Sequence, residues 1–168
     1  MAEFLWSDLH LFHDNILKYC DRPFENVEEM NKTILKNWKE IITKYDKLFC
    51  LGDFSFNRNT EQLQKLIQNL PGYKILIMGN HDRRKSVKGW LECGFNEVYA
   101  YPIIYKDFYI MSHEPVFINS HMPFVNIYGH LHNNSIDNPQ MINVCVEKLD
   151  YKPILFEEIE KRFKGEGD

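Results

Sequence analysis

The chain has 168 residues, of which 44% are hydrophobic and 14% aromatic, and its net charge is −4. This length and composition predict one domain over residues 1–168 with a substantial core. The acidic balance excludes the overall positive field that non-specific nucleic-acid binding requires. No stretch approaches the roughly 20 apolar residues of a membrane span, and the four cysteines are scattered, so we expect a reduced cytoplasmic protein without a membrane partner.

Apolar runs and amphipathic stretches alternate along the first part of the chain. We expect strands over residues 3–7, 47–53 and 73–80 and helices over 26–45, 59–72 and 84–92. The second part predicts a strand and a hairpin over 97–113, turning near Lys106 and Asp107, strands in 124–130 and 141–149, a helix over 155–163 and a frayed tail over 164–168. This order indicates an α/β protein with mixed sheets.

Residue types that bind metals follow five of the apolar runs. They are Asp8 and His10, then Asp53, then Asn80 with His81 and Asp82, then His113, and finally His130 and His132. Because the carboxyl ends of neighbouring parallel strands open on one crevice, we expect these side chains to meet there. Imidazole and carboxylate groups without cysteine favour a transition-metal centre over a structural zinc site.

Each of these motifs also has a simpler explanation when taken alone. An aspartate at a strand end commonly forms a turn or caps a helix, and Gly52-Asp53 is a common turn sequence. A single histidine such as His113 usually has an ordinary hydrogen-bond partner. His130 and His132 are two positions apart, so they face the same side of a strand that continues through them. The five blocks together, in this order, are hard to attribute to separate causes.

The order of these motifs resembles that of the calcineurin-like metallophosphoesterases. The motifs are Asp-x-His, Gly-Asp, Gly-Asn-His-Asp, a single His and Gly-His-x-His. The resemblance covers roughly residues 4–160, and the flanking segments "NILKYCDRPF" and "NVCVEKLDYKPILFEEI" resemble a small single-domain bacterial or bacteriophage branch. It implies an α/β fold of four layers, an αββα sandwich of two mixed β-sheets flanked by helices. The metals are then expected at the carboxyl ends of the strands.

The resemblance also implies two divalent metal ions, with manganese expected first and iron, zinc, nickel, cobalt or magnesium as alternatives. Asp8, His10 and His132 would hold one ion, Asn80, His113 and His130 would hold the other, and Asp53 would bridge them. His81 would be the catalytic acid, and Asp82 would orient it. Ions about 3.5–4 Å apart share a hydroxide that attacks phosphorus in line.

The expected substrate is a small phosphate ester or nucleotide, hydrolysed at a phosphodiester bond. A phosphomonoesterase or pyrophosphohydrolase with the same metals is an alternative, and a non-catalytic scaffold of this fold is another, although this chain keeps every ligand position. Whether the chain forms a homodimer stays open.

Candidate substrate contacts are Arg22, Arg83, Arg84 and His13. Charge runs at helix starts are usually solvated, so the basic run at 82–88 has this simpler explanation as well. Phe12 stands before His13 where the resemblance leads us to expect a glycine, so His13 is either a group facing the substrate or a surface residue at a helix start.

Overall fold

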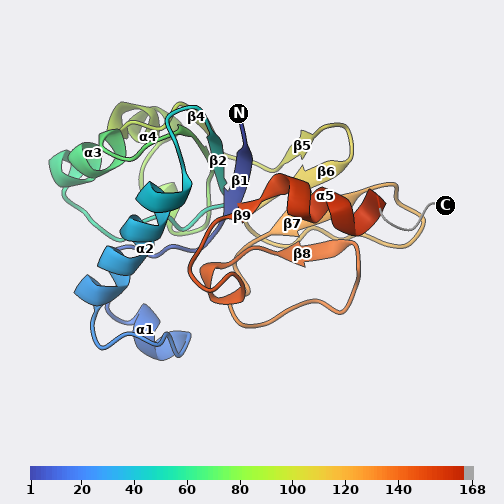
Figure 1. The fold of residues 1–168 in the computed structure, drawn as a ribbon, viewed down its shortest axis with the longest axis horizontal. Coiled ribbons are helices and arrows are strands. Elements are labelled where there is room, and N and C mark those ends of the chain that lie inside the picture. Colours follow the sequence, from blue (N-terminus) through green and yellow to red (C-terminus); the bar gives the residue numbers. More distant parts are fainter. Residues whose placement is uncertain (165–168) are drawn as a thin grey trace.

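Two β-sheets form the centre of the structure, a computed structural model that describes residues 1–164 (Figure 1). The first sheet has the order β4-β3-β2-β1-β9 and the second the order β5-β6-β7-β8. The strands are β1 (Glu3–Trp6), β2 (Lys47–Cys50), β3 (Tyr73–Ile77), β4 (Glu97–Tyr99), β5 (Ile103–Tyr105), β6 (Tyr109–Met111), β7 (Val125–Tyr128), β8 (Met141–Asn143) and β9 (Ile154–Leu155). Only β9 in the first sheet and β5 in the second pair antiparallel, so both sheets are mixed.

The longer helices begin where their sequences provide a cap. The helices are α1 (Ile16–Tyr19), α2 (Val27–Ile41), α3 (Thr60–Gln68), α4 (Val87–Cys93) and α5 (Phe156–Lys164), with short 3-10 helices η1 (Asp82–Arg84) and η2 (Val146–Lys148). Asn26, Asn59 and Ser86 precede α2, α3 and α4, and each side chain accepts a hydrogen bond from a backbone N–H in the first turn. These caps fix the helix starts that the sequence predicts.

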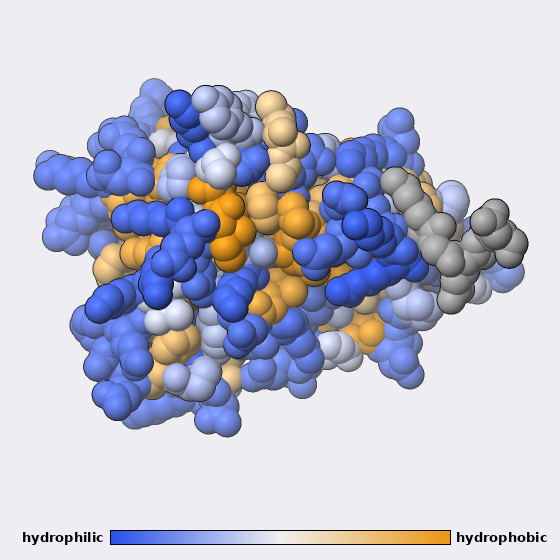
Figure 2. Space-filling model, in the orientation of Figure 1, coloured by the Kyte–Doolittle hydropathy of each residue, from blue (hydrophilic) through white to orange (hydrophobic). Residues whose placement is uncertain are grey.

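The first sheet is buried on both faces, which explains its nearly continuous apolar strands. On one face, Trp6 packs with Trp38 in a core beneath α2, α3 and α4. On the other face, Leu5 joins Ile127 of the second sheet and Phe156 of α5. Neighbouring residues of a strand point to opposite faces, so one strand serves both cores. Figure 2 shows hydrophilic side chains over most of one face of the molecule, with hydrophobic ones gathered near its middle.

Irregular chain covers the outer face of the second sheet. Asn126 of β7 accepts a hydrogen bond from the backbone N–H of Val116 at 2.8 Å, and the Tyr128 hydroxyl accepts one from Ile136 at 3.2 Å. In the part of the chain that the structure describes, no helix lies between β6 and β8. The predicted α/β class with two mixed sheets and helices is confirmed, and segments 114–124 and 131–140 provide much of the outermost layer.

Several predicted boundaries are wrong by a few residues. The predicted helix 26–45 ends at Ile41, 59–72 ends at Gln68, and 84–92 divides into η1 and α4. The strand and hairpin predicted over 97–113 are both present but lie in different sheets, with β4 in the first and the β5-β6 hairpin in the second. That hairpin does turn at Lys106 and Asp107, whose φ angles are 50° and 54°.

The ends of two other predicted segments differ in kind. The strand predicted over 124–130 is β7, which ends at Tyr128. His130 and His132 therefore lie in the following loop and not on one face of a strand. Residues 141–149 form the short strand β8 and then η2. The predicted tail falls largely on residues 165–168, outside the described part. No helix among residues 1–164 is long and apolar enough to cross a membrane.

Candidate metal centre

Five loops at the carboxyl ends of parallel strands bring the predicted ligands together. They carry Asp8 and His10 after β1, Asp53 after β2, Asn80, His81 and Asp82 after β3, His113 after β6, and His130 and His132 after β7. The Asp53 carboxylate lies at the centre of this group, because its Oδ2 is 3.5 Å from His10 Nε2 and also 3.5 Å from His113 Nε2. The two sheets thus contribute ligands to one site.

On one side of Asp53, three side chains form the first ligand group. Asp8 Oδ1 lies 3.6 Å from His10 Nε2 and 3.7 Å from His132 Nε2. Asp8 Oδ1 and His10 Nε2 are buried and have no hydrogen-bond partner among the described residues. Unpartnered buried polar atoms cost free energy, whereas a cation coordinated between them satisfies both. The donor set of two imidazoles and two carboxylates therefore fits a divalent transition metal.

On the other side of Asp53, three side chains form the second ligand group. Asn80 Oδ1 lies 2.9 Å from His113 Nε2 and 3.2 Å from His130 Nδ1, and these two ring nitrogens are 3.2 Å apart. The three atoms converge on one point. Two imidazoles, an amide oxygen and the shared Asp53 carboxylate fit a second divalent ion.

The outer nitrogens of two histidines are held by acceptors outside the ligand set. His113 Nδ1 lies 2.8 Å from the Leu51 carbonyl oxygen, and His132 Nδ1 lies 2.9 Å from Glu147 Oε1. A proton on Nδ1 donated to these acceptors leaves the Nε2 lone pair directed at the site. Burial disfavours protonation of His132, but hydrogen bonds to Cys20 and Glu147 outweigh it and raise the pKa of His132 to about 10.

Glu147 is the functional residue that the sequence reasoning missed. It lies in η2 with its side chain 2% exposed, and it is the only charged residue in the mostly apolar stretch 141–147. A single carboxylate in an apolar stretch was the available signal. Its Oε1 also accepts hydrogen bonds from Arg22 Nε at 2.9 Å and Nη2 at 2.7 Å. Glu147 therefore connects a buried cation to a candidate metal ligand.

The prediction that Arg22 contacts the substrate is wrong. Arg22 is 4% exposed, and its Nη1 and Nη2 donate to the carbonyl oxygens of Leu9 and Asp8 at 3.0 and 2.7 Å. Its remaining donors go mainly to Glu147. The guanidinium is thus committed to the backbone beside Asp8 and to the Glu147 carboxylate, where it supports the first ligand group from behind.

Asp8 is held by donors on its second oxygen. Oδ2 accepts from Ser7 Oγ at 2.6 Å and from the His130 backbone N–H at 2.8 Å, which leaves Oδ1 for the site. Burial alone would raise the pKa of Asp8, but hydrogen bonding and the charges of His10, His113 and His132 hold it well below its usual range. This carboxylate is therefore ionised, as a metal ligand must be.

Asp82 is completely buried and anchors the loops after β2 and β3. Its carboxylate accepts hydrogen bonds from the backbone N–H groups of Asp53 at 2.7 Å, Gly79 at 2.9 Å and Phe54 at 3.1 Å. Burial and the nearby Asp53 charge raise the pKa of Asp82 to about 7. These contacts position Asp53, and a direct effect of Asp82 on the His81 ring stays a prediction.

His81 lies at the open side of the site. Its side chain is 44% exposed, and Nε2 is 3.9 Å from Asp53 Oδ2. Its backbone N–H donates to Asp53 Oδ1 at 2.9 Å. The backbone of His81 is therefore tied to the ligand cluster, and its ring lies beside the cluster while remaining accessible to a substrate.

Five of the seven candidate ligands have a left-handed backbone. The φ angles are 58° at Asp8, 49° at His10, 52° at Asp53, 67° at His130 and 49° at His132. Residues with a side chain rarely adopt this region, and such conformations concentrate at functional sites. The surrounding contacts hold these side chains where an extended strand would not direct them.

Glycine is required where two of these loops touch. A Cβ atom on Gly52, whose φ is 95°, would lie 2.5 Å from His113 Nδ1 and 2.6 Å from the Gly79 backbone nitrogen. A glycine precedes three of the candidate ligands in the sequence. Here its role is to let the loop approach protein atoms closely.

The other predicted substrate contacts lie around Phe56. His13 stacks on the Phe56 ring with centroids 3.7 Å apart, and its Nδ1 is 3.2 Å from His10 Nδ1. Arg84 lies over the same ring at 5.2 Å, whereas Arg83 is exposed and pairs with Glu114 at 3.3 Å. His13 and Arg84 are thus beside the site.

Phe12, which precedes His13, has a φ of 63°. This is the left-handed conformation that glycine adopts freely. The position thus has a backbone conformation that the glycine expected from the resemblance would adopt freely, although it carries a large side chain.

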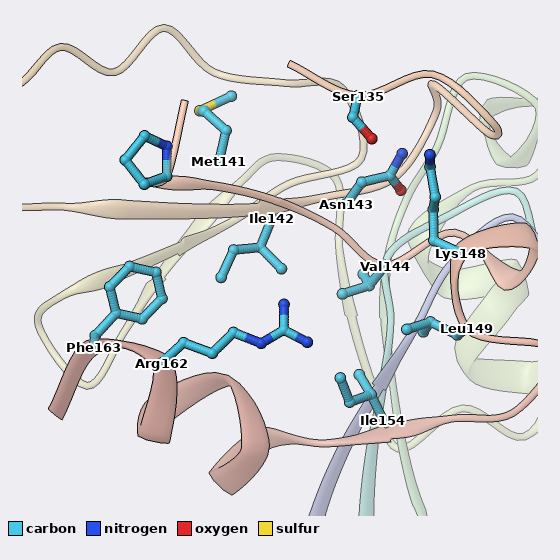
Figure 3. A pocket seen from close by; sticks show the side chains of 11 residues that line it. Ser135, Met141, Ile142, Asn143, Val144, Lys148, Leu149, Ile154, Arg162 and Phe163 are labelled. Atoms are coloured by element: carbon cyan, nitrogen blue, oxygen red, sulfur yellow. The ribbon is translucent and has the colours of Figure 1, made fainter. Parts of the chain in front are cut away.

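A separate cavity of about 480 Å³ lies between β8 and α5 (Figure 3). None of the predicted site residues lines it. Asn143 on its wall donates from Nδ2 to the His132 carbonyl oxygen at 3.0 Å, so the cavity borders the loop that carries this histidine. The ligand cluster, and not this cavity, has the chemistry of the predicted centre.

The fold and the site define an α/β protein with histidine, aspartate and asparagine ligands at the carboxyl ends of strands from two mixed sheets. The chain belongs to the calcineurin-like phosphoesterase family, whose sequence model matches residues 5–163. Membership implies metal-dependent hydrolysis of phosphoesters, and the clustered ligands support metal binding.

Similar proteins span both archaea and bacteria. "Uncharacterized protein MJ1445" of Methanocaldococcus jannaschii is 36% identical over 94% of this chain and 89% of that protein. The crystal structure of AQ665 from Aquifex aeolicus, a protein of unknown function, matches with a TM-score of 0.74 and 31% identity, covering 95% of this chain and 98% of the other. "Gene 66 protein" of Mycobacterium phage L5 is 37% identical over 45% of this chain and 37% of that protein.

Proposed function

We propose that this protein is a phosphodiesterase that requires two divalent metal ions and acts on small nucleotide-like diesters. The observation that carries this proposal is the position of Asp53 Oδ2, 3.5 Å from a histidine nitrogen of each ligand group. A carboxylate oxygen shared in this way suits a bridging ligand between two ions. We expect manganese first, since nitrogen and oxygen donors without thiolate favour it among several transition metals.

Each ligand group would hold one ion, and the surrounding residues fix its donors. When bound, the two ions would supply Lewis-acid polarisation of the phosphate and activation of water at neutral pH. Asn80 contributes an oxygen without adding negative charge, which helps the site accept an anionic substrate. Glu147 and the Leu51 carbonyl keep His132 and His113 oriented.

His81 would protonate the leaving oxygen. Its ring lies at the accessible edge of the cluster, and the backbone bond to Asp53 fixes its distance from the ligands. Proton donation to a departing alkoxide typically accelerates hydrolysis about 10²- to 10⁴-fold. Because the activated water would be the nucleophile, no protein nucleophile is needed. The side chains of the site would hold the ions, orient the substrate and protonate the leaving oxygen.

The test is metal analysis combined with hydrolysis assays on monoesters, diesters, pyrophosphates and cyclic nucleotides. We expect about two ions per chain, activity lost with chelator and restored by Mn²⁺, and the highest kcat/KM on diesters. Higher kcat/KM on monoesters or pyrophosphates would replace the diesterase assignment with one of those activities. Full turnover of metal-stripped protein in excess chelator would refute the metal mechanism, and no turnover of any ester would support a non-catalytic scaffold.

A further inference from the structure

A cavity of about 300 Å³ lies beside the metal centre and is lined by Asn57, Arg58, Arg84 and Lys85. We call it the Arg58 cavity. Its walls come from the loop after β2, which also carries Asp53, and from the end of η1 with the residue that follows it, shortly after His81. The cavity is thus built on the chain that forms the site.

Phe56 connects the Arg58 cavity to the catalytic region. Its ring centroid lies 4.7 Å from that of His81 on one side. The Arg84 guanidinium lies 5.2 Å from the same centroid. A substrate bound beside His81 can therefore extend past Phe56 to the cations.

The three cations of the cavity form no ion pair with a carboxylate of the described residues. Among residues 1–164, no carboxylate forms an ion pair with Arg58, Arg84 or Lys85. Their neighbours in the same basic run differ, because Arg83 pairs with Glu114 and Lys88 pairs with Glu92. In a chain with net charge −4, three cations without an ion-pair partner on one small cavity favour an anion there, although the charges of Asp82 and Asp53 also act on Arg84.

Two of the cations are already held in place. Arg84 donates to the Ser55 carbonyl oxygen and stacks on Phe56, which leaves most of its five N–H donors free. Lys85 Nζ donates to Thr60 Oγ1 at 3.1 Å. Ordering side chains in advance lowers the entropy cost of binding, and arginine with lysine is the usual donor set for phosphate.

We infer that the Arg58 cavity is a subsite for a second phosphate group of the substrate. The preferred substrate is then a nucleotide that carries a phosphate group in addition to the ester being cleaved. This inference rests on the proposed function, since it names the substrate class of the same site.

The test compares two substrates that differ only in the second phosphate. One is thymidine 5′-(p-nitrophenyl phosphate), and the other is the same diester with an added 3′-phosphate. A third substrate, assayed in parallel, carries the p-nitrophenyl phosphate at the 3′ position and the added phosphate at the 5′ position. We expect the added phosphate to lower KM about tenfold in at least one orientation with little change in kcat, the effect of two or three partly exposed charge contacts. In an Arg58→Gln/Lys85→Gln double variant this difference should disappear, while KM for the single-phosphate ester stays the same.

Lys88→Gln is the matched control, because it removes a cation of the same run that already has a partner. It should keep the full difference in KM. Equal KM values for the two substrates in the parent protein, or a difference that survives in the double variant, would overturn the inference.

Binding provides a readout that does not depend on turnover. Calorimetry with thymidine 3′,5′-bisphosphate and thymidine 5′-monophosphate should give about tenfold tighter binding of the bisphosphate to the parent and no difference in the double variant. Equal affinities would overturn the inference on their own. If the single-phosphate ester is not hydrolysed with Mn²⁺, the proposed function fails; if it is hydrolysed and the bisphosphate has no advantage, only the subsite fails.

Discussion

Glu147→Gln should weaken both the fold and the metal centre. The carboxylate accepts two hydrogen bonds from Arg22 and one from His132, and the two side chains of its ion pair are 0% and 2% exposed. Removing the negative charge leaves the Arg22 guanidinium buried without a counter-charge, which typically costs about 3–5 kcal/mol. Because glutamine keeps one acceptor oxygen, we expect about 3 kcal/mol less stability for the metal-free protein, at the lower end of that range.

The same change should loosen His132. Losing the charged acceptor on Nδ1 weakens the orientation and basicity of the ring, and comparable changes behind metal ligands reduce metal affinity about 10- to 100-fold. Urea unfolding of the metal-free variant measures the first effect, and calorimetric titration with Mn²⁺ measures the second. Activity at saturating Mn²⁺ should recover in part, since Glu147 touches no substrate group.

Glu114→Gln is the control for this experiment. Glu114 also pairs with an arginine, but the Arg83 and Glu114 side chains are 60% and 44% exposed. Loss of an exposed pair changes stability by about 1 kcal/mol or less. If Glu147→Gln has the same urea midpoint and Mn²⁺ affinity as the parent, the assigned connection from Arg22 through Glu147 to His132 is wrong.

Four further outcomes test the site. Asp53→Asn should lower metal content and activity more than His10→Ala or His132→Ala, because it disturbs both groups; equal, mild losses measured by metal analysis would contradict the shared position. His81→Ala should keep its metals and slow alkyl diesters far more than bis-nitrophenyl phosphate, whose leaving group departs as an anion; equal slowing, with chemistry rate-limiting, would exclude the acid role. Gly79→Ala should lower the urea midpoint and metal content together, since a Cβ there would collide with the Asp53 backbone nitrogen at 2.7 Å; normal values of both would show that the loop adjusts. The raised pKa of His132 means that a metal must displace its proton, so Mn²⁺ affinity should rise about tenfold per pH unit between pH 6 and 9; affinity independent of pH would contradict this competition.

The sequence by itself determined the fold class and the identity of most candidate ligands. Apolar runs and asparagine or serine caps are local signals, because the pattern that predicts a buried strand and the residue that caps a helix are both read from a short stretch of sequence. The ligand types were also readable, since Asp8, Asp53 and Asn80 each follow an apolar run after one intervening residue. Because parallel strands end at the same edge of a sheet, the meeting of these ligands could be predicted from the strand pattern alone.

Only the tertiary structure decided which residues support and orient those ligands. Arg22 and Glu147 are 125 positions apart, and their meeting depends on the packing of the segment after β1 against η2. The same packing buries Arg22, which the sequence alone presents as an ordinary surface cation. The left-handed backbone of His130 and His132 likewise contradicts a simple strand pattern. Contacts between distant segments fix these features, because the free energy that stabilises them comes from burial and pairing that no local pattern encodes.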